Sequence, residues 1–185
     1  MAVAEFDALG DGVHEGIVAG GREVAMTGAG VSVLCSGGLD SAVLVAAEAR
    51  DRVVQPVYVS AGLSWEREEL ALLERLLPAL GASARVAPLA RLRVDVSDLY
   101  PASHWALTAA PPAYDTPDEA VYLPGRNVLL LSKAAVLCAA LQIPRMAIGP
   151  LAGNPFPDAT PDFLAAMGRA LSLGLAWDIQ IDAPF

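Results

Sequence analysis

Six consecutive residues combine the residue types that bind phosphate. They are Ser36, Gly37, Gly38, Leu39, Asp40 and Ser41. The two adjacent glycines allow backbone N–H groups to approach an anion without obstruction from a Cβ atom, and the serines add hydroxyl donors. The segment stands between a β-prone run (31–35) and an apolar helical pattern (39–50), so the first helical turn would add partial positive charge. Spacing alone also fits a tight turn that binds nothing.

Asp40 is the acidic residue of this segment. A carboxylate beside a triphosphate is unfavourable unless a cation offsets it, so we expect Asp40 to hold Mg²⁺ or to orient the loop. The lysine of the Walker pattern is absent from the segment. The sequence therefore points away from the lysine-containing phosphate loops.

A second polar group, Gly125, Arg126 and Asn127, precedes an apolar pattern that predicts a helix over 127–141. A guanidinium at that position can neutralise phosphate or pyrophosphate charge in a transition state. We therefore predict that Arg126 and Asp40 are catalytic and that all three residues contact the nucleotide. The alternatives are a solvated Arg126 and an Asn127 that only caps the helix.

A third polar segment, 154–163, places Asp158 just before a helix start at Thr160 and Pro161. An aspartate there can accept hydrogen bonds from a base-like ring, which makes Asp158 a candidate substrate ligand. A turn aspartate ahead of a helix explains the same pattern equally well.

Alternating β-prone and helical patterns predict an α/β fold with a doubly wound, mainly parallel five-stranded sheet. The expected strands are 31–35, 53–59, 83–89, 145–149 and 178–181. Between them we expect helices over 39–50, from an N-cap at Ser64 to Gly81, over 127–141 and from Thr160 onward. The proline-rich stretch 91–122 is expected to be a long loop. We read residues 1–30 as an irregular N-terminal extension and 31–185 as one domain.

The composition argues against several function classes. The chain has 185 residues, with 12 basic and 21 acidic side chains. Because phosphate-backbone recognition needs clustered lysine and arginine, we expect no nucleic-acid partner. No apolar run is long enough to span a membrane, and a secretory signal pattern is missing, so we expect no membrane partner and a cytoplasmic location. The two cysteines, Cys35 and Cys138, are predicted to be buried hydrophobic residues.

The segment Ser36–Ser41 resembles the SGGxDS signature of the pyrophosphate-loop ATPases. The resemblance implies an adenine nucleotide alpha hydrolase-like fold, with ATP and Mg²⁺ as cofactors. In that family the loop grips the β- and γ-phosphates while a substrate oxygen attacks the α-phosphorus.

The segment Leu123–Ser132 resembles the PGRN-plus-helix block of the 7-cyano-7-deazaguanine synthases, which make the queuosine precursor nitrile. The resemblance implies a carbon–nitrogen ligase that adenylates 7-carboxy-7-deazaguanine, releases AMP and pyrophosphate, and uses ammonia. Asp158 lies where this family has a proline-aspartate segment that faces the substrate. Another pyrophosphate-loop amidotransferase-type ligase and a non-catalytic nucleotide-binding subunit are the competing interpretations.

The sequence departs from this family in two places. The resembled synthases continue past the position of 181–185 into a helix and a four-cysteine zinc site, so we expect no metal site here. The segment 60–66 also lacks the family's usual glutamine, arginine and histidine pattern, which leaves the exact substrate open. With 55% hydrophobic residues, we expect a homodimer or a complex with another subunit.

Overall fold

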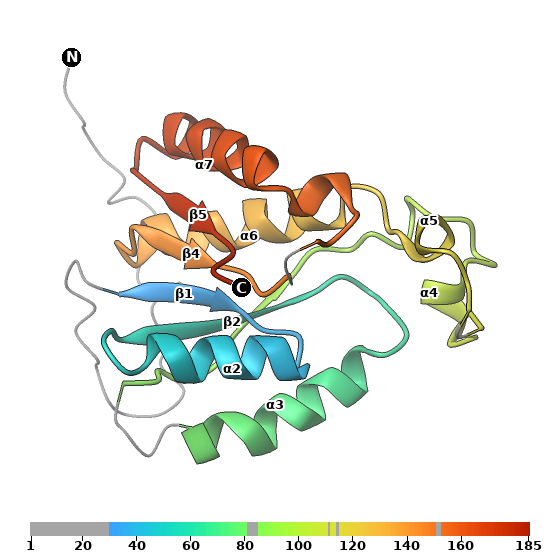
Figure 1. Cartoon of the computed structure of the whole chain (residues 1–185), viewed down its shortest axis with the longest axis horizontal. Coiled ribbons are helices and arrows are strands. Elements are labelled where there is room, and N and C mark those ends of the chain that lie inside the picture. Colours follow the sequence, from blue (N-terminus) through green and yellow to red (C-terminus); the bar gives the residue numbers. More distant parts are fainter. Residues whose placement is uncertain (1–29, 81–84, 111, 114, 151–152) are drawn as a thin grey trace.

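A five-stranded parallel sheet forms the centre of the protein in the computed structural model, which describes residues 30–80, 85–110, 112–113, 115–150 and 153–185. The strands are β1 (Val31–Leu34), β2 (Val54–Ser60), β3 (Ala90–Arg93), β4 (Arg145–Ala147) and β5 (Gln180–Asp182). Their order is β3-β2-β1-β4-β5, and every pair is parallel (Figure 1). This architecture confirms the predicted fold class. The predicted extension 1–30 lies, except for its last residue, outside the described residues.

Four longer helices cover the two faces of the sheet (Figure 1). They are α2 (Leu39–Glu48), α3 (Glu66–Leu80), α6 (Arg126–Ala140) and α7 (Pro161–Leu175). Helices α2 and α3 pack on one face, around a core that includes Leu44, Leu73 and Tyr58. Helices α6 and α7 cover the other face, around Leu131 and Met146. None of the described helices is long and apolar enough to cross a membrane.

The predicted start of the last helix is confirmed in detail. Pro161 occupies the first turn of α7, where its missing N–H needs no partner, and the Thr160 hydroxyl accepts a hydrogen bond from the Phe163 N–H at 3.2 Å.

The two cysteines are buried and free, as predicted. Burial raises the pKa of both thiols to about 12, so they are unreactive at neutral pH.

The third predicted strand, 83–89, was wrong in position. Residues 83 and 84 lie outside the described residues, Val86 forms an isolated bridge to Val54, and the regular strand is β3 at Ala90–Arg93. Pro56 in β2 explains the break, because Val54 bonds Arg85 and Ala87 on this side and Pro56, two residues on, has no N–H to continue the ladder. The Gln55 side chain instead donates to the Pro88 carbonyl oxygen at 2.9 Å.

The prediction of a structureless loop over 91–122 was also wrong in part. Its first residues belong to β3, and two short helices follow, α4 (Trp105–Thr108) and α5 (Asp118–Val121). Figure 1 shows them in an arm beside the sheet.

At the start of α3, the carboxylate of Glu66 folds back onto the end of β2. It accepts from the Ala61 and Leu63 N–H groups and from the Ser60 hydroxyl.

A short 3₁₀ turn, η2 (Pro157–Ala159), precedes α7. Near the amino-terminal edge of the sheet, a partly buried ion network joins the end of α2 to the first residue of β4 and the last residue of β5. Arg145 bonds both oxygens of Glu48, at 2.7 and 2.9 Å, and both oxygens of Asp182, at 2.9 and 3.0 Å. Arg52 adds a bond to Glu48 at 3.0 Å. We call these four residues the amino-edge network.

Candidate phosphate site at the carboxyl edge of the sheet

The loop after β1 lies where the strand order reverses, with β2 on one side and β4 on the other. In open α/β sheets, ligands bind in the crevice at this switch point, beyond the carboxyl ends of the strands. Gly37 has a φ of +75°, and a Cβ there would come within 2.7 Å of the Glu69 carbonyl oxygen in α3. Glycine is therefore required at position 37 by its conformation and by its contact with α3.

Two serines fix the shape of this loop from inside. The Ser41 hydroxyl donates to the Gly38 carbonyl at 3.0 Å and accepts from the Ser36 N–H at 3.3 Å. The Ser36 hydroxyl accepts from the Gly38 N–H at 3.4 Å. Ser41 is buried and holds the loop closed, whereas Ser36 and Gly38 are exposed. The predicted phosphate-binding loop is thus prebuilt, with its outer surface open to solvent.

Leu39 and Asp40 begin α2 on the outside of the loop. Leu39 is 79% exposed, and Asp40 is exposed beside it. Gly149, just after β4, packs against the same turn, because a Cβ on it would lie 3.5 Å from the Asp40 carbonyl carbon. A small residue here lets the chain after β4 approach the loop closely.

Two hydrogen bonds, both donated by Asn127, form a clasp with Asp158. The Asn127 backbone N–H donates to Asp158 Oδ2 at 3.0 Å, and the Asn127 side-chain amide donates to the Asp158 carbonyl at 2.9 Å. Asp158 is only 6% exposed. The clasp joins η2 to the start of α6, and Gly125, with a φ of +74°, leads the chain into that helix. One carboxylate oxygen of Asp158 is thus committed to the protein.

Arg126 is the first residue of α6, where the helix dipole disfavours a positive charge. Its Nε is buried and has no hydrogen-bond partner among the described residues, and none of their ion pairs includes Arg126. A buried, unpaired donor on a charged side chain is unfavourable by itself. The position therefore suits an incoming anion better than it suits a free protein.

Glu69, in the first turn of α3, contacts the loop through its backbone. Its Oε2 accepts a hydrogen bond of 2.8 Å from the Tyr58 hydroxyl in β2. Burial raises the pKa of Glu69, while the Tyr58 hydrogen bond and the charge of Arg126 act in the opposite direction. Burial and Glu69 raise the pKa of Tyr58, so the phenol keeps its proton.

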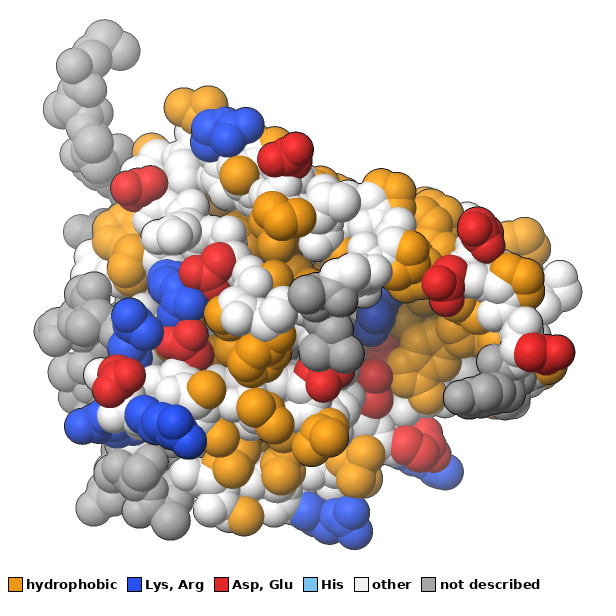
Figure 2. Space-filling model, in the orientation of Figure 1, with side chains coloured by type: hydrophobic (Ala, Val, Ile, Leu, Met, Phe, Trp, Pro, Cys, Tyr) orange, Lys and Arg blue, Asp and Glu red, His pale blue; other side chains and the backbone are white. Residues whose placement is uncertain are grey.

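Aromatic pairs hold the surrounding loops. Tyr122 stacks on Phe156 with ring centroids 4.9 Å apart, and Trp65 stacks on Trp105 at 5.2 Å. The Tyr100 hydroxyl donates to the Pro124 carbonyl at 3.4 Å. Figure 2 shows the surface hollowed between the arm of α4 and α5 and the body of the protein, with basic, acidic and hydrophobic side chains on its walls. The arm thus borders a hollow in the surface.

The structure gathers the predicted residues in two groups at one edge of the sheet. Ser36–Ser41 form the first group, and Gly125, Arg126, Asn127 and Asp158 form the second. Glu69 connects them, since its backbone contacts Gly37 and its carboxylate feels the charge of Arg126. The sequence reasoning missed Glu69 and Gly149. A glycine directly after the fourth strand was the available signal for Gly149.

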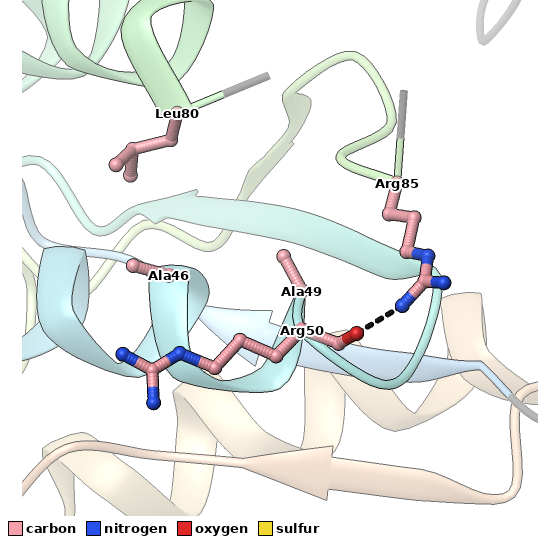
Figure 3. Close-up of a pocket in the computed structure, with 5 residues that line it drawn as sticks. All are labelled: Ala46, Ala49, Arg50, Leu80 and Arg85. Atoms are coloured by element: carbon pink, nitrogen blue, oxygen red, sulfur yellow. Dashed lines mark hydrogen bonds between the residues drawn. The ribbon is translucent and has the colours of Figure 1, made fainter. Parts of the chain in front are cut away.

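A pocket of about 410 Å³ lies elsewhere, near the opposite end of α2. Its lining is Ala46, Ala49, Arg50, Leu80 and Arg85. Figure 3 shows Arg85 pointing across to the carbonyl oxygen of Arg50, to which it donates a hydrogen bond. This pocket faces the carboxyl end of α2, where the helix dipole disfavours anions. It is not the phosphate site.

Within the described ranges, no three His, Cys, Asp or Glu side chains are grouped closely enough to hold a metal ion.

The fold defines the class as a doubly wound α/β domain with a five-stranded parallel sheet. A solved structure described as a predicted subunit of tRNA methyltransferase from Methanocaldococcus jannaschii has a similar fold, with a TM-score of 0.50 and 16% identity. The similarity covers 84% of this chain and 67% of that one. At this identity the likeness concerns the fold alone.

The family described as "Queuosine biosynthesis protein QueC" matches residues 30–185, and the chain belongs to this family. It is 29% identical over 160 residues to 7-cyano-7-deazaguanine synthase 1 of Desulfitobacterium hafniense, covering 84% of this chain and 70% of that protein. It is 32% identical over 149 residues to 7-cyano-7-deazaguanine synthase of Methanothrix thermoacetophila, covering 77% and 66%. The chain thus spans about two thirds of the length of these relatives.

Proposed function

We propose that the protein is an ATP-dependent ligase that activates the carboxylate of 7-carboxy-7-deazaguanine and converts it toward the nitrile, the queuosine precursor. The single observation that carries the proposal is the convergence at one sheet edge of a prebuilt glycine loop and an arginine without an ion pair among the described residues. Such a pair of anion-binding features fits the leaving pyrophosphate of an adenylation. Membership of the family supports the substrate.

The proposed reaction begins when a carboxylate oxygen attacks the α-phosphorus of ATP. The bond between the α-phosphorus and the β-phosphate bridging oxygen breaks, giving an acyl-adenylate and pyrophosphate. Ammonia then attacks the acyl carbon, loses a proton and displaces AMP to give the amide. A second ATP activates the amide oxygen in the same way and releases a second pyrophosphate, and loss of AMP and of both protons on the nitrogen leaves the nitrile.

The residues present fit these steps. Gly38 is exposed at the N-cap of α2, and a Cβ there would meet only the Ser36 hydroxyl, at 3.4 Å. Its surroundings therefore leave room for phosphate oxygens, which the first turn of α2 would bind. Arg126 would neutralise the charge that develops on pyrophosphate. Asp40 is exposed beside the loop and would face the Mg²⁺ carried by the phosphates.

Asp158 has a different part in the proposal. One of its oxygens holds the start of α6 through Asn127, so its first effect on catalysis is to fix Arg126. Its second oxygen has no hydrogen bond among those found in the described residues and is the atom we assign to the substrate ring. This assignment predicts that Asp158→Asn weakens substrate binding more than ATP binding.

An oxygen-18 transfer experiment tests the proposal. The protein is incubated with ATP, Mg²⁺, ammonia and 7-carboxy-7-deazaguanine labelled in its carboxylate, and the nucleotide products are analysed by mass spectrometry. We expect AMP that carries one labelled oxygen, together with unlabelled pyrophosphate. ADP and phosphate as main products would refute the adenylation. ATP binding without any turnover would indicate a nucleotide-binding subunit instead.

A further inference from the structure

Tyr122 and Phe156 form an aromatic pair that lies outside the hydrophobic core. Their rings stack with centroids 4.9 Å apart and planes 16° from parallel, and both residues are partly exposed. The other buried or partly buried aromatic residues that the structure describes belong to a core cluster or pack against one: Tyr58, Trp65, Tyr100, Trp105, Phe163 and Trp177. Tyr122 and Phe156 do neither. Core packing therefore does not explain their stack.

The backbone holds both rings in place. The Phe156 N–H donates to Asn154 Oδ1 at 2.9 Å, and the Phe156 carbonyl accepts from the Ala159 N–H at 3.1 Å. Tyr122 caps α5, where its N–H donates to the Asp118 carbonyl at 3.0 Å. A ligand that stacks on these rings would therefore find them already ordered, which lowers the entropy cost of binding.

The stacked pair lies next to the clasp. Both connect the same two segments, 122–127 and 156–158. In the first segment the Arg126 N–H donates to the Leu123 carbonyl at 3.1 Å, which closes a tight turn. In the second segment only one residue separates the stacked phenylalanine from Asp158. The rings are thus held beside the aspartate and beside the turn that leads to the arginine.

The chemistry of this corner suits one kind of planar ring. A partly exposed aromatic stack can be extended by a further ring, and such stacking accepts any heteroaromatic base. The edge of the ring is selected by Asp158, because an ionised carboxylate only accepts hydrogen bonds. One of its oxygens accepts from the Asn127 N–H, and the other has no hydrogen bond among the described residues. A guanine-type edge presents adjacent N–H donors to it, whereas an adenine-type edge presents a ring nitrogen that repels it.

We propose that Tyr122 and Phe156 form the stacking platform for a guanine-type ring whose N–H edge faces Asp158. This inference rests on the proposed function and adds to it the residues that select the ring of the substrate. The work of the site is then divided. The glycine loop and Arg126 bind phosphate, and the stacked pair with Asp158 binds the ring. The adenine of ATP is the other source of a planar ring, and the acceptor character of Asp158 disfavours it.

The test is the affinity for 7-deazaguanine, which has the ring and the N–H edge but no carboxylate to react. Titration calorimetry on wild type should show 7-deazaadenine binding about tenfold or more weakly. Tyr122→Leu and Phe156→Leu should each weaken 7-deazaguanine binding by about tenfold or more while pyrophosphate still binds. Tyr122→Phe and Phe156→Tyr keep the rings and should restore most of the affinity.

The control for the substitution itself is Phe185→Leu. Phe185 is 38% exposed and stacks on no other ring of the described residues. This variant should bind 7-deazaguanine like wild type. Should Tyr122→Leu and Phe156→Leu fold poorly, NMR on wild type replaces them. Ring protons of bound 7-deazaguanine should then show nuclear Overhauser contacts with the rings of Tyr122 and Phe156, and their absence at saturating probe would refute the platform.

The remaining outcomes separate this inference from the proposed function. If both leucine variants bind pyrophosphate and also bind 7-deazaguanine like wild type, the stack is only structural and the inference fails, while oxygen-18 transfer still tests the reaction. Tighter binding of 7-deazaadenine than of 7-deazaguanine, weakened by the same variants, would assign the rings to ATP and also overturn it. Weakened 7-deazaguanine binding in the variants without oxygen-18 transfer in wild type would support the ring site and refute the proposed reaction.

Discussion

Charged side chains are paired with one another near the amino edge of the sheet, but two charged side chains at its carboxyl edge have no ion-pair partner among the described residues. At the amino edge, Arg145, Glu48, Asp182 and Arg52 satisfy one another through five hydrogen bonds. At the carboxyl edge, Arg126 and Asp40 take part in none of the ion pairs of the described residues, and the Arg126 Nε is buried without a partner. Arg126 also stands at the unfavourable end of a helix dipole.

This difference separates charges that support the fold from charges that we propose bind a ligand. Glu48 is the buried member of the amino-edge network, so removing Arg145 leaves a buried charge without its main partner, which destabilises the protein. An unpaired charge gives the free protein no such benefit, and it acquires a partner only when a ligand binds. The amino edge is therefore the internal standard against which the proposed phosphate edge can be tested.

The largest expected effect is on turnover. Arg126→Gln should reduce the rate of pyrophosphate release by about 100-fold, as when one transition-state donor is removed. Arg126→Lys should recover only part of it, because an ammonium lacks the planar fork of a guanidinium. Steady-state pyrophosphate release measures both variants. A rate close to that of wild type in Arg126→Gln would remove this residue from the mechanism.

The second prediction compares two neighbouring glycines. Gly37→Ala meets a positive φ and a backbone oxygen at 2.7 Å, and should cost about 1–3 kcal/mol of stability. Gly38→Ala has an ordinary φ of −74° and no close backbone contact, so its stability should change little. Denaturant unfolding measures both. Equal stability of the two variants would show that the loop does not pack on α3 as described.

The third prediction concerns the exposed polar side chains of the loop. Asp40→Ala and Ser36→Ala should each lower turnover by at least about 10-fold, the effect of losing a contact of about 1.4 kcal/mol in the transition state. Neither should lower the melting temperature appreciably, because both residues are exposed. Wild-type turnover in both variants would leave the loop as a structural turn.

The smallest expected effect is on the melting temperature at low pH and concerns Glu48. The hydrogen bond and charge of Arg145 lower the pKa of Glu48 from its model-peptide value of 4.5. A lowered pKa gives stability that is present above pH 4.5 and is lost as the pH falls through the folded-state pKa. Glu48→Gln should therefore show a shallower loss of melting temperature below that pH. Parallel curves for variant and wild type would mean that the network contributes little.

Much of this architecture follows from local patterns. The two glycines before Leu39, and the threonine and proline before Asp162, predict helix starts because their chemistry is contained within a few residues. The third strand was misplaced because the missing N–H of Pro56, in the neighbouring strand β2, interrupts the ladder after Ala87. Propensity does not reveal which hydrogen bonds a neighbouring strand needs.

The site was predictable only as separate pieces. Motifs identified Gly37, Arg126 and Asp158, but the clasp between Asp158 and Asn127 spans 31 residues of sequence and depends on how α6 meets η2. Glu69 has the sequence signature of any acidic residue in a first helical turn, like Glu68 beside it. Only the tertiary contacts with Tyr58 and Gly37 distinguish it.

The most direct test of the account is the melting temperature of Arg126→Gln and Arg145→Gln, each measured with and without ATP and Mg²⁺. A ligand that binds the native state raises the melting temperature. We predict that Arg126→Gln melts like wild type without ATP but loses most of the rise that ATP causes. Arg145→Gln should melt lower without ATP and keep the full rise. A full ATP response in Arg126→Gln, or its loss in Arg145→Gln, would contradict the division between the two edges.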